Sequence, residues 1–340
     1  MDKARIAVLG ASGYTGADLV RLALVHPRLE IAALAADRRA GAEMAAIWPH
    51  FAPHRLPPLV RAEDIDFARI DAVFGCLPHG ASAELLSGIT GPLIIDLSAD
   101  FRLKDPAVYA QWYGLEHPAP HLLSQAVYGL SEHARPALPG ARLVACPGCY
   151  PTAALLALLP LAGLIDVARV AIAALSGVSG AGRSLKEANL FCEVAEGVHP
   201  YGIGRHRHMP EMEQELGRAA GQAATVGFTP HLVPMNRGEL VTCTVEGAPA
   251  AELREALATA YAGEPFVHLL PEGVAPATRM VRGSNNCVIN LFADRVPGRS
   301  LVIAAIDNLV KGSSGQAIQN LNLVMGWPET LGLEAAALFP

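Results

Sequence analysis

The sequence has little charge, few aromatic residues and no long uninterrupted apolar run. Charged residues make up 17% of the chain, and 32 acidic against 26 basic residues leave a formal net charge of −6. Because the basic residues form no stripe, we expect no nucleic-acid partner. The chain is 51% hydrophobic, but Gly, Pro or charged residues interrupt its apolar runs before they reach the roughly 20 residues that cross a bilayer. We therefore expect no membrane partner either.

Cysteine is too sparse and too scattered for a disulfide-stabilised protein. The six cysteines stand at positions 76, 146, 149, 192, 243 and 287 of 340. This spacing predicts reduced thiols rather than a disulfide framework. The first residues lead directly into an apolar strand and show no signal or transit peptide pattern, so we expect a cytoplasmic protein. The length is enough for two domains with cores of their own.

Two kinds of pattern divide the chain. Up to about residue 145, strand and helix patterns alternate, with strands expected at 4–9, 29–36, 72–77 and 92–97. This alternation is typical of a doubly wound parallel sheet. Beyond Cys149, only two helices, near 209–220 and 250–261, interrupt the strand-like runs at 167–175, 225–233, 239–245, 287–293 and 300–306. That pattern indicates a mostly antiparallel second part, with a hairpin turn at 294–299.

We therefore expect an α/β protein with two domains. A Rossmann-type NADP-binding domain would span residues 1–148 and be completed by a C-terminal helix segment, 313–340, whose apolar stripe lies at about 314–325. A mostly antiparallel α+β domain over 149–312 would serve catalysis, substrate binding and oligomerisation.

A glycine-rich loop between the first strand and an apolar helix predicts a dinucleotide site. Gly10, Gly13 and Gly16 allow a tight turn and let the backbone approach a pyrophosphate, while the helix N-terminus offers N–H donors to its charge. The spacing G-x-x-G-x-x-G departs from the usual G-x-G-x-x-G, so the order of strand, loop and helix carries this prediction.

The end of the second strand indicates which dinucleotide binds. Asp37, Arg38 and Arg39 follow this strand, where the adenosine ribose would lie. An acidic residue there reads the 2′-hydroxyl of NAD, whereas arginine pairs with the 2′-phosphate of NADP. Two arginines beside one aspartate favour NADP. The alternative is that both arginines belong to a solvated loop.

Cys149 stands where a strand turns into a helix. The strand at 142–145 ends in Pro147 and Gly148, and Pro151 suits the first turn of the apolar helix that follows. Free N–H groups and the positive end of the helix dipole would stabilise a thiolate there, and the same N–H groups could hold an oxyanion. Two alternatives remain: a buried apolar cysteine, and a thioredoxin-type redox pair, since Cys146 and Cys149 have C-x-x-C spacing.

A cluster of two arginines and two histidines at 205–208 offers a proton carrier. An imidazole can exchange protons at neutral pH, and the guanidinium groups suit a phosphate or carboxylate. The spacing does not separate His206 from His208 as the acting residue. His-x-His is also a minimal metal-ligand spacing, but no partners stand at zinc spacing, so we expect no metal. A second loop of small residues, 175–183, would let backbone approach a ligand.

Seven segments in chain order together form a recognisable set. They are Gly-Ala-Ser-Gly-Tyr-Thr-Gly at 10–16, Leu-Pro-His-Gly at 77–80, Asp-Leu-Ser-Ala-Asp-Phe-Arg at 96–102, Pro-Gly-Cys-Tyr-Pro-Thr at 147–152, Ser-Gly-Val-Ser-Gly-Ala-Gly-Arg at 176–183, His-Arg-His-Met-Pro-Glu at 206–211 and Asp-Asn-Leu-Val-Lys-Gly at 307–312. With these segments the chain resembles the N-acetyl-γ-glutamyl-phosphate reductases of arginine biosynthesis. The resemblance implies the two-domain fold that aspartate-semialdehyde and glyceraldehyde-3-phosphate dehydrogenases share. Reductases of a carrier-bound aminoadipyl phosphate, from lysine biosynthesis, resemble the chain in two segments but have Gly-Cys-Asn at the cysteine. Cys146 departs from the family's usual asparagine.

The resemblance also implies a reaction and the residues that carry it. Cys149 would attack an acyl phosphate, NADPH would reduce the thioester to an aldehyde, and His208, which aligns with the family's histidine, would relay the proton. The expected cofactor-binding residues are Gly10, Ser12, Gly13, Tyr14, Thr15, Gly16, Arg38, Arg39, Pro78, Ser179, Gly180 and Asn308. The expected substrate-binding residues are Ser98, Arg102, Lys186 and Arg205. Inorganic phosphate and a homodimer or homotetramer complete the expected partners, and a non-catalytic NADP-binding sensor is the alternative.

Overall fold

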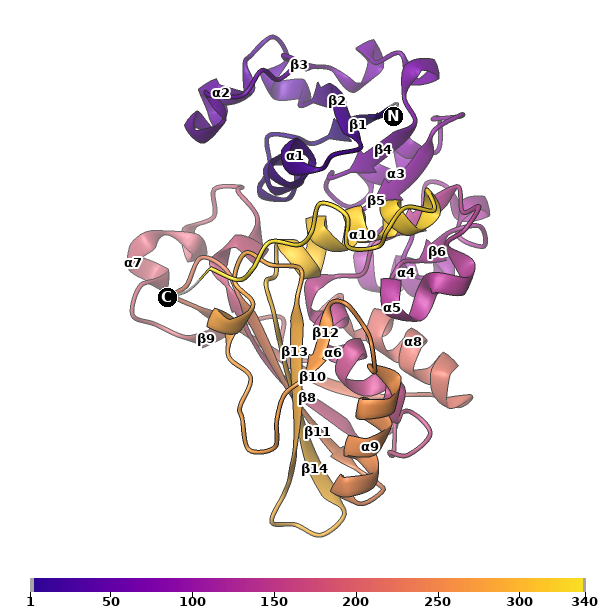
Figure 1. Cartoon of the computed structure of the whole chain (residues 1–340), viewed down its shortest axis with the longest axis vertical. Coiled ribbons are helices and arrows are strands. Elements are labelled where there is room, and N and C mark those ends of the chain that lie inside the picture. Colours follow the sequence, from indigo (N-terminus) through magenta and orange to yellow (C-terminus); the bar gives the residue numbers. More distant parts are fainter. Residues whose placement is uncertain (1–2, 339–340) are drawn as a thin grey trace. The chain divides into compact units, whose positions relative to one another are not determined.

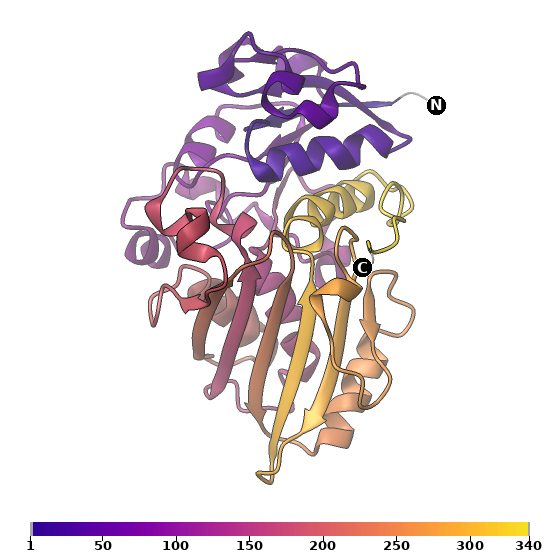
Figure 2. The ribbon, with the colours of Figure 1, turned by 90° about the vertical axis from the view of Figure 1, so that its left-hand side faces the viewer.

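The computed structural model describes residues 3–338, which form two units, each with a sheet of its own (Figures 1 and 2). Unit 1 contains the described residues up to Pro147 and the later segment Ser313–Glu334. Unit 2 contains Gly148–Gly312 and the described residues from Ala335 onward. The chain therefore leaves unit 1 just before Cys149 and returns to it after Gly312.

Seven parallel strands form the sheet of unit 1, in the order β3-β2-β1-β4-β5-β7-β6. Their bounds are β1 (Ala4–Leu9), β2 (Leu29–Ala35), β3 (Leu59–Val60), β4 (Ala72–Gly75), β5 (Leu93–Asp96), β6 (Val127–Tyr128) and β7 (Leu143–Ala145). The central strands are apolar on both faces, as buried parallel strands are; Ile6, Val8 and Val73 have no exposed surface. This confirms the doubly wound sheet that the alternating patterns predict.

The helices of unit 1 connect these strands. They are α1 (Tyr14–Val25), α2 (Met44–Ile47), α3 (Ala81–Leu86), α4 (Pro106–Tyr113), α5 (Ser131–Ala134) and α10 (Gly315–Val324). Short 3₁₀ turns lie at η1 (Asp37–Arg39), η2 (Pro49–Phe51), η3 (Ala62–Asp64), η4 (Phe67–Arg69), η5 (Pro120–Leu122) and η6 (Arg135–Ala137). α10 packs on α1, α5 and β5.

The C-terminal segment is divided in a way that the sequence did not predict. The apolar stripe expected at 314–325 is α10, and Ala317, Ile318 and Leu321 on it are fully buried. The helix ends at Val324, and Pro328 could not continue it because proline lacks a backbone N–H. The described residues from Ala335 onward belong to unit 2 rather than to unit 1, so only part of the segment 313–340 completes the parallel-sheet unit.

The sheet of unit 2 also has seven strands, in the order β12-β13-β14-β11-β8-β10-β9. Their bounds are β8 (Val170–Gly177), β9 (His199–Pro200), β10 (Val226–Val233), β11 (Glu239–Glu246), β12 (Val267–Leu269), β13 (Cys287–Ala293) and β14 (Arg299–Ile306). Four neighbouring pairs are antiparallel, and two, β8 with β10 and β12 with β13, are parallel. The mostly antiparallel second sheet and the hairpin between β13 and β14 are thus confirmed.

Helices cover one face of this sheet (Figure 1). They are α6 (Cys149–Leu158), α8 (Met209–Ala220) and α9 (Ala250–Ala260), and α7 (Phe191–Val194) lies in a connecting segment. Short 3₁₀ turns lie at η7 (Leu159–Leu161), η8 (Val178–Ala181), η9 (Glu187–Asn189) and η10 (Thr278–Met280), and η11 (Val310–Ser314) is a short π-helix. Along β8, buried and exposed residues alternate, which is the pattern of a sheet with one covered face.

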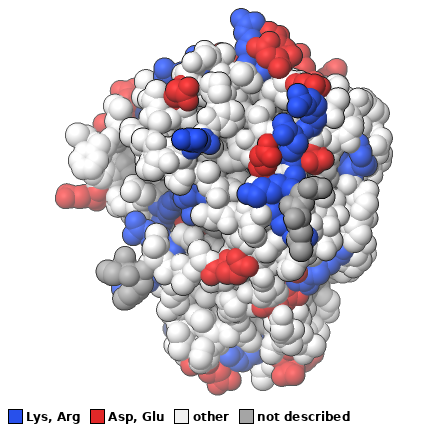
Figure 3. Space-filling view, turned by 45° about the horizontal axis from the view of Figure 1, so that its top comes forward, with Lys and Arg blue, Asp and Glu red and all other residues white. Residues whose placement is uncertain are grey.

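None of the helices in residues 3–338 is long and apolar enough to cross a bilayer. On the face in Figure 3, most of the surface is uncharged, and basic side chains lie beside acidic ones.

Candidate active site

The glycine loop of unit 1 is shaped by close backbone contacts. Gly10 follows β1 with φ +82°, and a Cβ there would collide with the carbonyl oxygen of Cys76, so no other residue fits. Gly13 precedes α1, which has no side-chain cap. The first N–H groups of this helix are therefore not used by a capping side chain. This arrangement matches the expected pyrophosphate site.

A cavity of about 690 Å³ adjoins this loop within unit 1. Its lining includes Gly10, Asp37, Arg38 and Arg61. Asp37 accepts a hydrogen bond from the Ala62 N–H at 3.2 Å, so part of its carboxylate is engaged in holding the neighbouring turn. Arg39, which was predicted beside Arg38, is exposed and is not among the residues lining this cavity.

Arg61 is a cavity residue that sequence reasoning missed. It follows β3 just as Arg38 follows β2, and the parallel pairing of Ala35 with Val60 brings the two strand ends together. Glu63 pairs with Arg61 at 2.6 Å. Because β3 has only two residues, no strand pattern in the sequence marks this position.

In unit 2, Cys149 is the first residue of α6 and is partly exposed. Gly148 caps the helix without a side-chain bond, and its N–H donates to Glu211 Oε1 at 2.9 Å. The Gly148 carbonyl accepts from both the N–H and the hydroxyl of Thr152. A Cβ at Gly312 would come within 2.8 Å of the Cys149 Cβ, so only glycine allows the thiol its position there.

The other thiol of the C-x-x-C spacing has a different environment. Cys146 is 1% exposed, and Asn320 Nδ2 lies 3.7 Å from its sulfur. Burial raises the pKa of Cys146 to about 12, so this thiol stays protonated and unreactive. None of the six cysteines takes part in a disulfide. These observations give no support to the redox-pair interpretation.

The structure distinguishes the two histidines of the 205–208 cluster. His206 Nδ1 accepts the backbone N–H of His208 at 3.2 Å. Burial, assisted by Arg207, lowers the pKa of His206 to about 4, so this ring is neutral at physiological pH. His206 thus orients the backbone at His208, which directly precedes α8.

An aromatic cluster brings both histidines to the residue next to Cys149. The Tyr150 ring centroid lies 5.7 Å from that of His206 and 5.9 Å from that of His208. Tyr150 also shares a hydrogen bond of 2.9 Å between its hydroxyl and that of Tyr201. The predicted proton carrier therefore lies against the residue that follows the predicted nucleophile.

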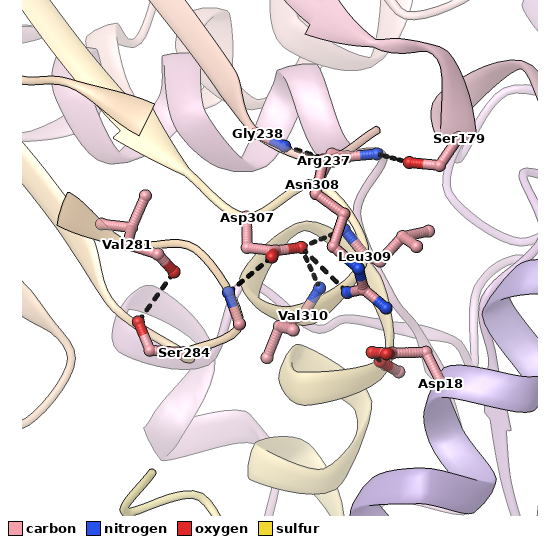
Figure 4. A network of polar contacts seen from close by, with 12 residues as sticks. Asp18, Ser179, Arg237, Gly238, Val281, Ser284, Asp307, Asn308, Leu309 and Val310 are labelled. Carbon is pink, nitrogen blue, oxygen red and sulfur yellow. Dashed lines mark hydrogen bonds and ion pairs between the residues drawn. The ribbon is translucent and has the colours of Figure 1, made fainter. Parts of the chain in front are cut away.

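A buried polar network joins two loops of unit 2 (Figure 4). Asn308, 2% exposed, accepts the Gly238 N–H at 2.8 Å and donates to Ser179 Oγ at 2.9 Å. The adjacent Asp307 accepts from three backbone N–H groups and lies 3.4 Å from Arg237 Nη1. Two predicted cofactor residues, Ser179 and Asn308, are thus brought together, with their side chains bonded to each other. Gly180, beside them, is exposed.

The four predicted substrate residues fall into two groups. Ser98 and Arg102 are buried in unit 1: Ser98 Oγ donates to Asp96 at 2.6 Å, and Arg102 donates to the carbonyl oxygens of Cys146 and Leu97 at 2.7 and 2.9 Å. These bonds hold the ends of β5 and β7. The other two, Lys186 and Arg205, are exposed in unit 2.

The remaining predicted cofactor residues lie in unit 1. Ser12, Tyr14 and Thr15 belong to the loop and first turn of α1, and all three are partly exposed. The Tyr14 ring lies 5.8 Å from that of Trp48. Pro78 is exposed in the turn after β4.

Two buried carboxylates were missed. Glu211, 1% exposed, holds the Gly148 N–H, and the His-x-Pro-Glu end of its motif was a signal for it. Glu239, with no exposed surface, begins β11. A charged residue at the start of an apolar run is typical of a solvated strand end, so no pattern in the sequence indicated its burial.

Family models match most of the chain, one in each unit. "Semialdehyde dehydrogenase, NAD binding domain" matches residues 5–141, and "Semialdehyde dehydrogenase, dimerisation domain" matches residues 149–308. Among solved structures, aspartate semialdehyde dehydrogenase II of Vibrio cholerae, in complex with ASA, has a TM-score of 0.73 at 16% identity, over 96% of this chain and 99% of that one. The NADP-containing enzyme of Candida albicans has a TM-score of 0.67 at 17% identity, over 95% and 99%. Fold and matches define an NAD(P)-binding oxidoreductase of the semialdehyde dehydrogenase class.

Curated relatives narrow the class. The N-acetyl-γ-glutamyl-phosphate reductase of Rhodospirillum rubrum is 55% identical over 100% of this chain and 99% of its own. A probable chloroplastic N-acetyl-γ-glutamyl-phosphate reductase of Oryza sativa is 54% identical over 100% of this chain and 83% of its own. The chain belongs to the N-acetyl-γ-glutamyl-phosphate reductase family. The resemblance seen in the seven segments is thus confirmed, and the aminoadipyl alternative is not favoured.

Proposed function

We propose that the chain reduces N-acetyl-L-glutamyl 5-phosphate to N-acetyl-L-glutamate 5-semialdehyde, with NADPH and through a thioester on Cys149. The observation that carries the proposal is the placement of Cys149 at the uncapped start of α6, beside the histidine cluster, in a chain of this family. A thiolate at a helix N-terminus is stabilised by the free N–H groups and the dipole.

The residues of unit 2 can support each chemical step. The Cys149 sulfur attacks the carbonyl carbon of the acyl phosphate, and the bond to the phosphate oxygen breaks, releasing inorganic phosphate. NADPH, when bound, supplies the hydride that reduces the thioester carbon. The oxyanion is held by backbone N–H groups at the start of α6 and receives its proton from His208. His208 then takes this proton back while the C–S bond breaks, so that the aldehyde leaves and the electron pair returns to sulfur.

The residues of unit 1 fit NADPH better than NADH. The cradle at Gly10, which a Cβ would fill, and the uncapped start of α1 suit a pyrophosphate. Arg38 and Arg61 both line the adjoining cavity, while Asp37 is partly engaged with Ala62. Two guanidinium groups suit the 2′-phosphate.

The proposal also covers the substrate groups. The exposed cations Lys186 and Arg205 have charges available to a phosphate or carboxylate. Ser98 and Arg102 remain predicted substrate residues, although their bonds within unit 1 also support a structural role. We likewise propose that the cofactor contacts Pro78, Ser179, Gly180 and Asn308.

We also infer a homodimer or homotetramer in the cytoplasm. The match to a dimerisation domain supports assembly through unit 2. Exposed apolar side chains in that unit offer surface for it, namely Leu185, Leu190, Phe191, Val198 and Ile203. Six cysteines without a disulfide suit a reducing compartment.

Phosphate-dependent reduction of NADP, measured at 340 nm with N-acetylglutamate 5-semialdehyde, tests the activity in the reverse direction. The aminoadipyl semialdehyde analogue runs beside it. We expect turnover only with the acetylglutamate compound and only with phosphate. Tight NADP binding with no turnover on either aldehyde would instead favour the non-catalytic sensor.

A further inference from the structure

Glu239 is a carboxylate enclosed within unit 2. It has no exposed surface, and as the first residue of β11 it pairs with Ser176 of β8 and Ile306 of β14. α6 packs on both β11 and β14. A Cβ built at Gly312 would lie 3.2 Å from the Ile306 side chain and 2.8 Å from the Cys149 Cβ. Glu239 therefore begins its strand beside the thiol that starts α6.

The carboxylate has few groups to stabilise its charge. Both oxygens are buried, and neither makes a hydrogen bond among residues 3–338. The Cys149 thiol lies near enough to act on the carboxyl group and lower its pKa. An ionised carboxylate buried without donors is costly, and it gains from any proton within reach.

Several charged and titratable groups surround this pair. Glu211 binds the Gly148 N–H beside Cys149, and His206 and His208 lie against Tyr150. Burial raises the pKa of both Tyr150 and Tyr201, and Glu239 and Cys149 add to these rises. Asp307 lies on the side of β14 and is paired with Arg237. Burial raises the pKa of Glu239 to about 8, the thiol acts against this rise, and Asp307 adds to it.

We propose that Glu239 accepts the proton of the Cys149 thiol when its sulfur attacks the substrate, and returns it when the aldehyde leaves. The S–H bond breaks, its proton moves to a carboxylate oxygen, and the sulfur electron pair forms the bond to carbon. At the end the C–S bond breaks, the pair returns to sulfur, and the carboxylic acid gives the proton back. His208 is then left to serve the oxygen of the substrate. A base that titrates near the working pH is the most effective kind.

The proposal rests on the nucleophilic role of Cys149 in the proposed function, so its test needs no substrate. The rate of Cys149 alkylation by iodoacetamide is measured from pH 5 to 9.5 on the full chain. Mass spectrometry separates the label on Cys149 from that on Cys192, which is exposed. The variants are Glu239→Gln and, as control, Glu213→Gln. Glu213 is a partly buried carboxylate of raised pKa on α8, and it accepts the N–H of Val226 in β10.

We expect the wild-type rate to rise along a limb near pH 8, where the pair loses its proton. Glu239→Gln should lose this limb and react at least tenfold more slowly at pH 8, and kcat should fall by about 10²–10⁴. Glu213→Gln should keep both limb and rate. A faster alkylation in Glu239→Gln would show that the carboxylate only repels the thiolate, and an unchanged profile would show a structural role; either result overturns the proposal.

Glu239→Asp keeps the inference testable if the glutamine variant does not fold. It retains the charge but withdraws it by one methylene, so alkylation at pH 8 should again be slower than in the wild type. A wild-type rate in folded Glu239→Asp overturns proton transfer across this contact. The alkylation rates can be interpreted even if the semialdehyde assay shows no turnover. The role of Glu239 and the proposed reaction are therefore tested independently.

Discussion

The turn from β1 into α1 and the turn from β7 into α6 expose a helix N-terminus by different means. After β1, the loop depends on backbone alone: Gly10 is required by its contact with the Cys76 carbonyl, and no side chain caps α1. After β7, the turn into α6 is held by a side chain from far along the chain, since Glu211 binds the Gly148 N–H. The first turn suits a ligand that brings its own charge, whereas the second positions the thiol that we propose as the nucleophile.

The strongest test of this contrast is the thiol itself. Cys149→Ser should abolish turnover and leave NADPH affinity unchanged, because the nucleophile and the dinucleotide loop belong to different units. Cys146→Ser should keep most activity, since the pKa of that thiol is raised to about 12. Steady-state kinetics and fluorescence titration of NADPH measure the two effects. Equal loss of activity in both variants under reducing conditions would contradict a single nucleophile.

The next largest effect concerns the histidines that accompany this turn. His208→Asn should lower kcat by about 10²–10⁴ for a lost acid–base group. His206→Asn should be milder, because the pKa of His206, lowered to about 4, leaves that ring neutral near pH 7. A reversed order of the two kcat values would assign the proton transfer to His206.

Cofactor preference tests the dinucleotide site beside the glycine loop after β1. Replacing Arg38 and Arg39 together by alanine should weaken NADPH far more than NADH, since each lost charge-assisted contact costs about 1.5–3 kcal/mol. Because Arg61 rather than Arg39 lines the cavity, Arg61→Ala should show the same selective loss, while Arg39→Ala alone should be mild. Dissociation constants for both cofactors check this. Equal losses for NADPH and NADH would mean that these arginines support the fold instead.

The smallest expected effect compares two glycines of one loop. Gly10→Ala forces a side chain into the left-handed region and against Cys76, so the free energy of unfolding should fall by more than the roughly 1–2 kcal/mol of the backbone term alone. Gly13→Ala should be tolerated, because its Cβ would lie 3.5 Å from the nearest atom, the Gly10 carbonyl oxygen. Urea unfolding of both variants measures the difference. A tolerant Gly10→Ala would show that the loop can relax.

A feature could be predicted from the sequence when the residues that form it are close together along the chain, and it was missed when they are far apart. The strand, glycine loop and helix at 4–25 are contiguous, so their pattern is complete in the sequence, and the same is true of Cys149 at the start of its helix. Glu211, Glu239 and Arg61 acquire their positions only when distant strands and helices meet. Asn308 was predicted from its motif, but the sequence could not reveal that its amide joins Ser179 to Gly238.

The return of the chain to unit 1 after Gly312 has a consequence for synthesis on the ribosome. All of Gly148–Gly312 is made before α10, yet α10 supplies buried contacts to unit 1: Asn320 binds the Gly129 carbonyl and the Ser131 hydroxyl. Unit 1 therefore cannot complete its folding until α10 has been synthesised. The segment that forms unit 2 leaves the ribosome before that point and can begin to fold. Domains generally fold in the order in which they leave the ribosome, but here the first to appear is the last to be finished. Nascent chains stalled before α10 should consequently expose the apolar surface of unit 1 and depend on chaperones.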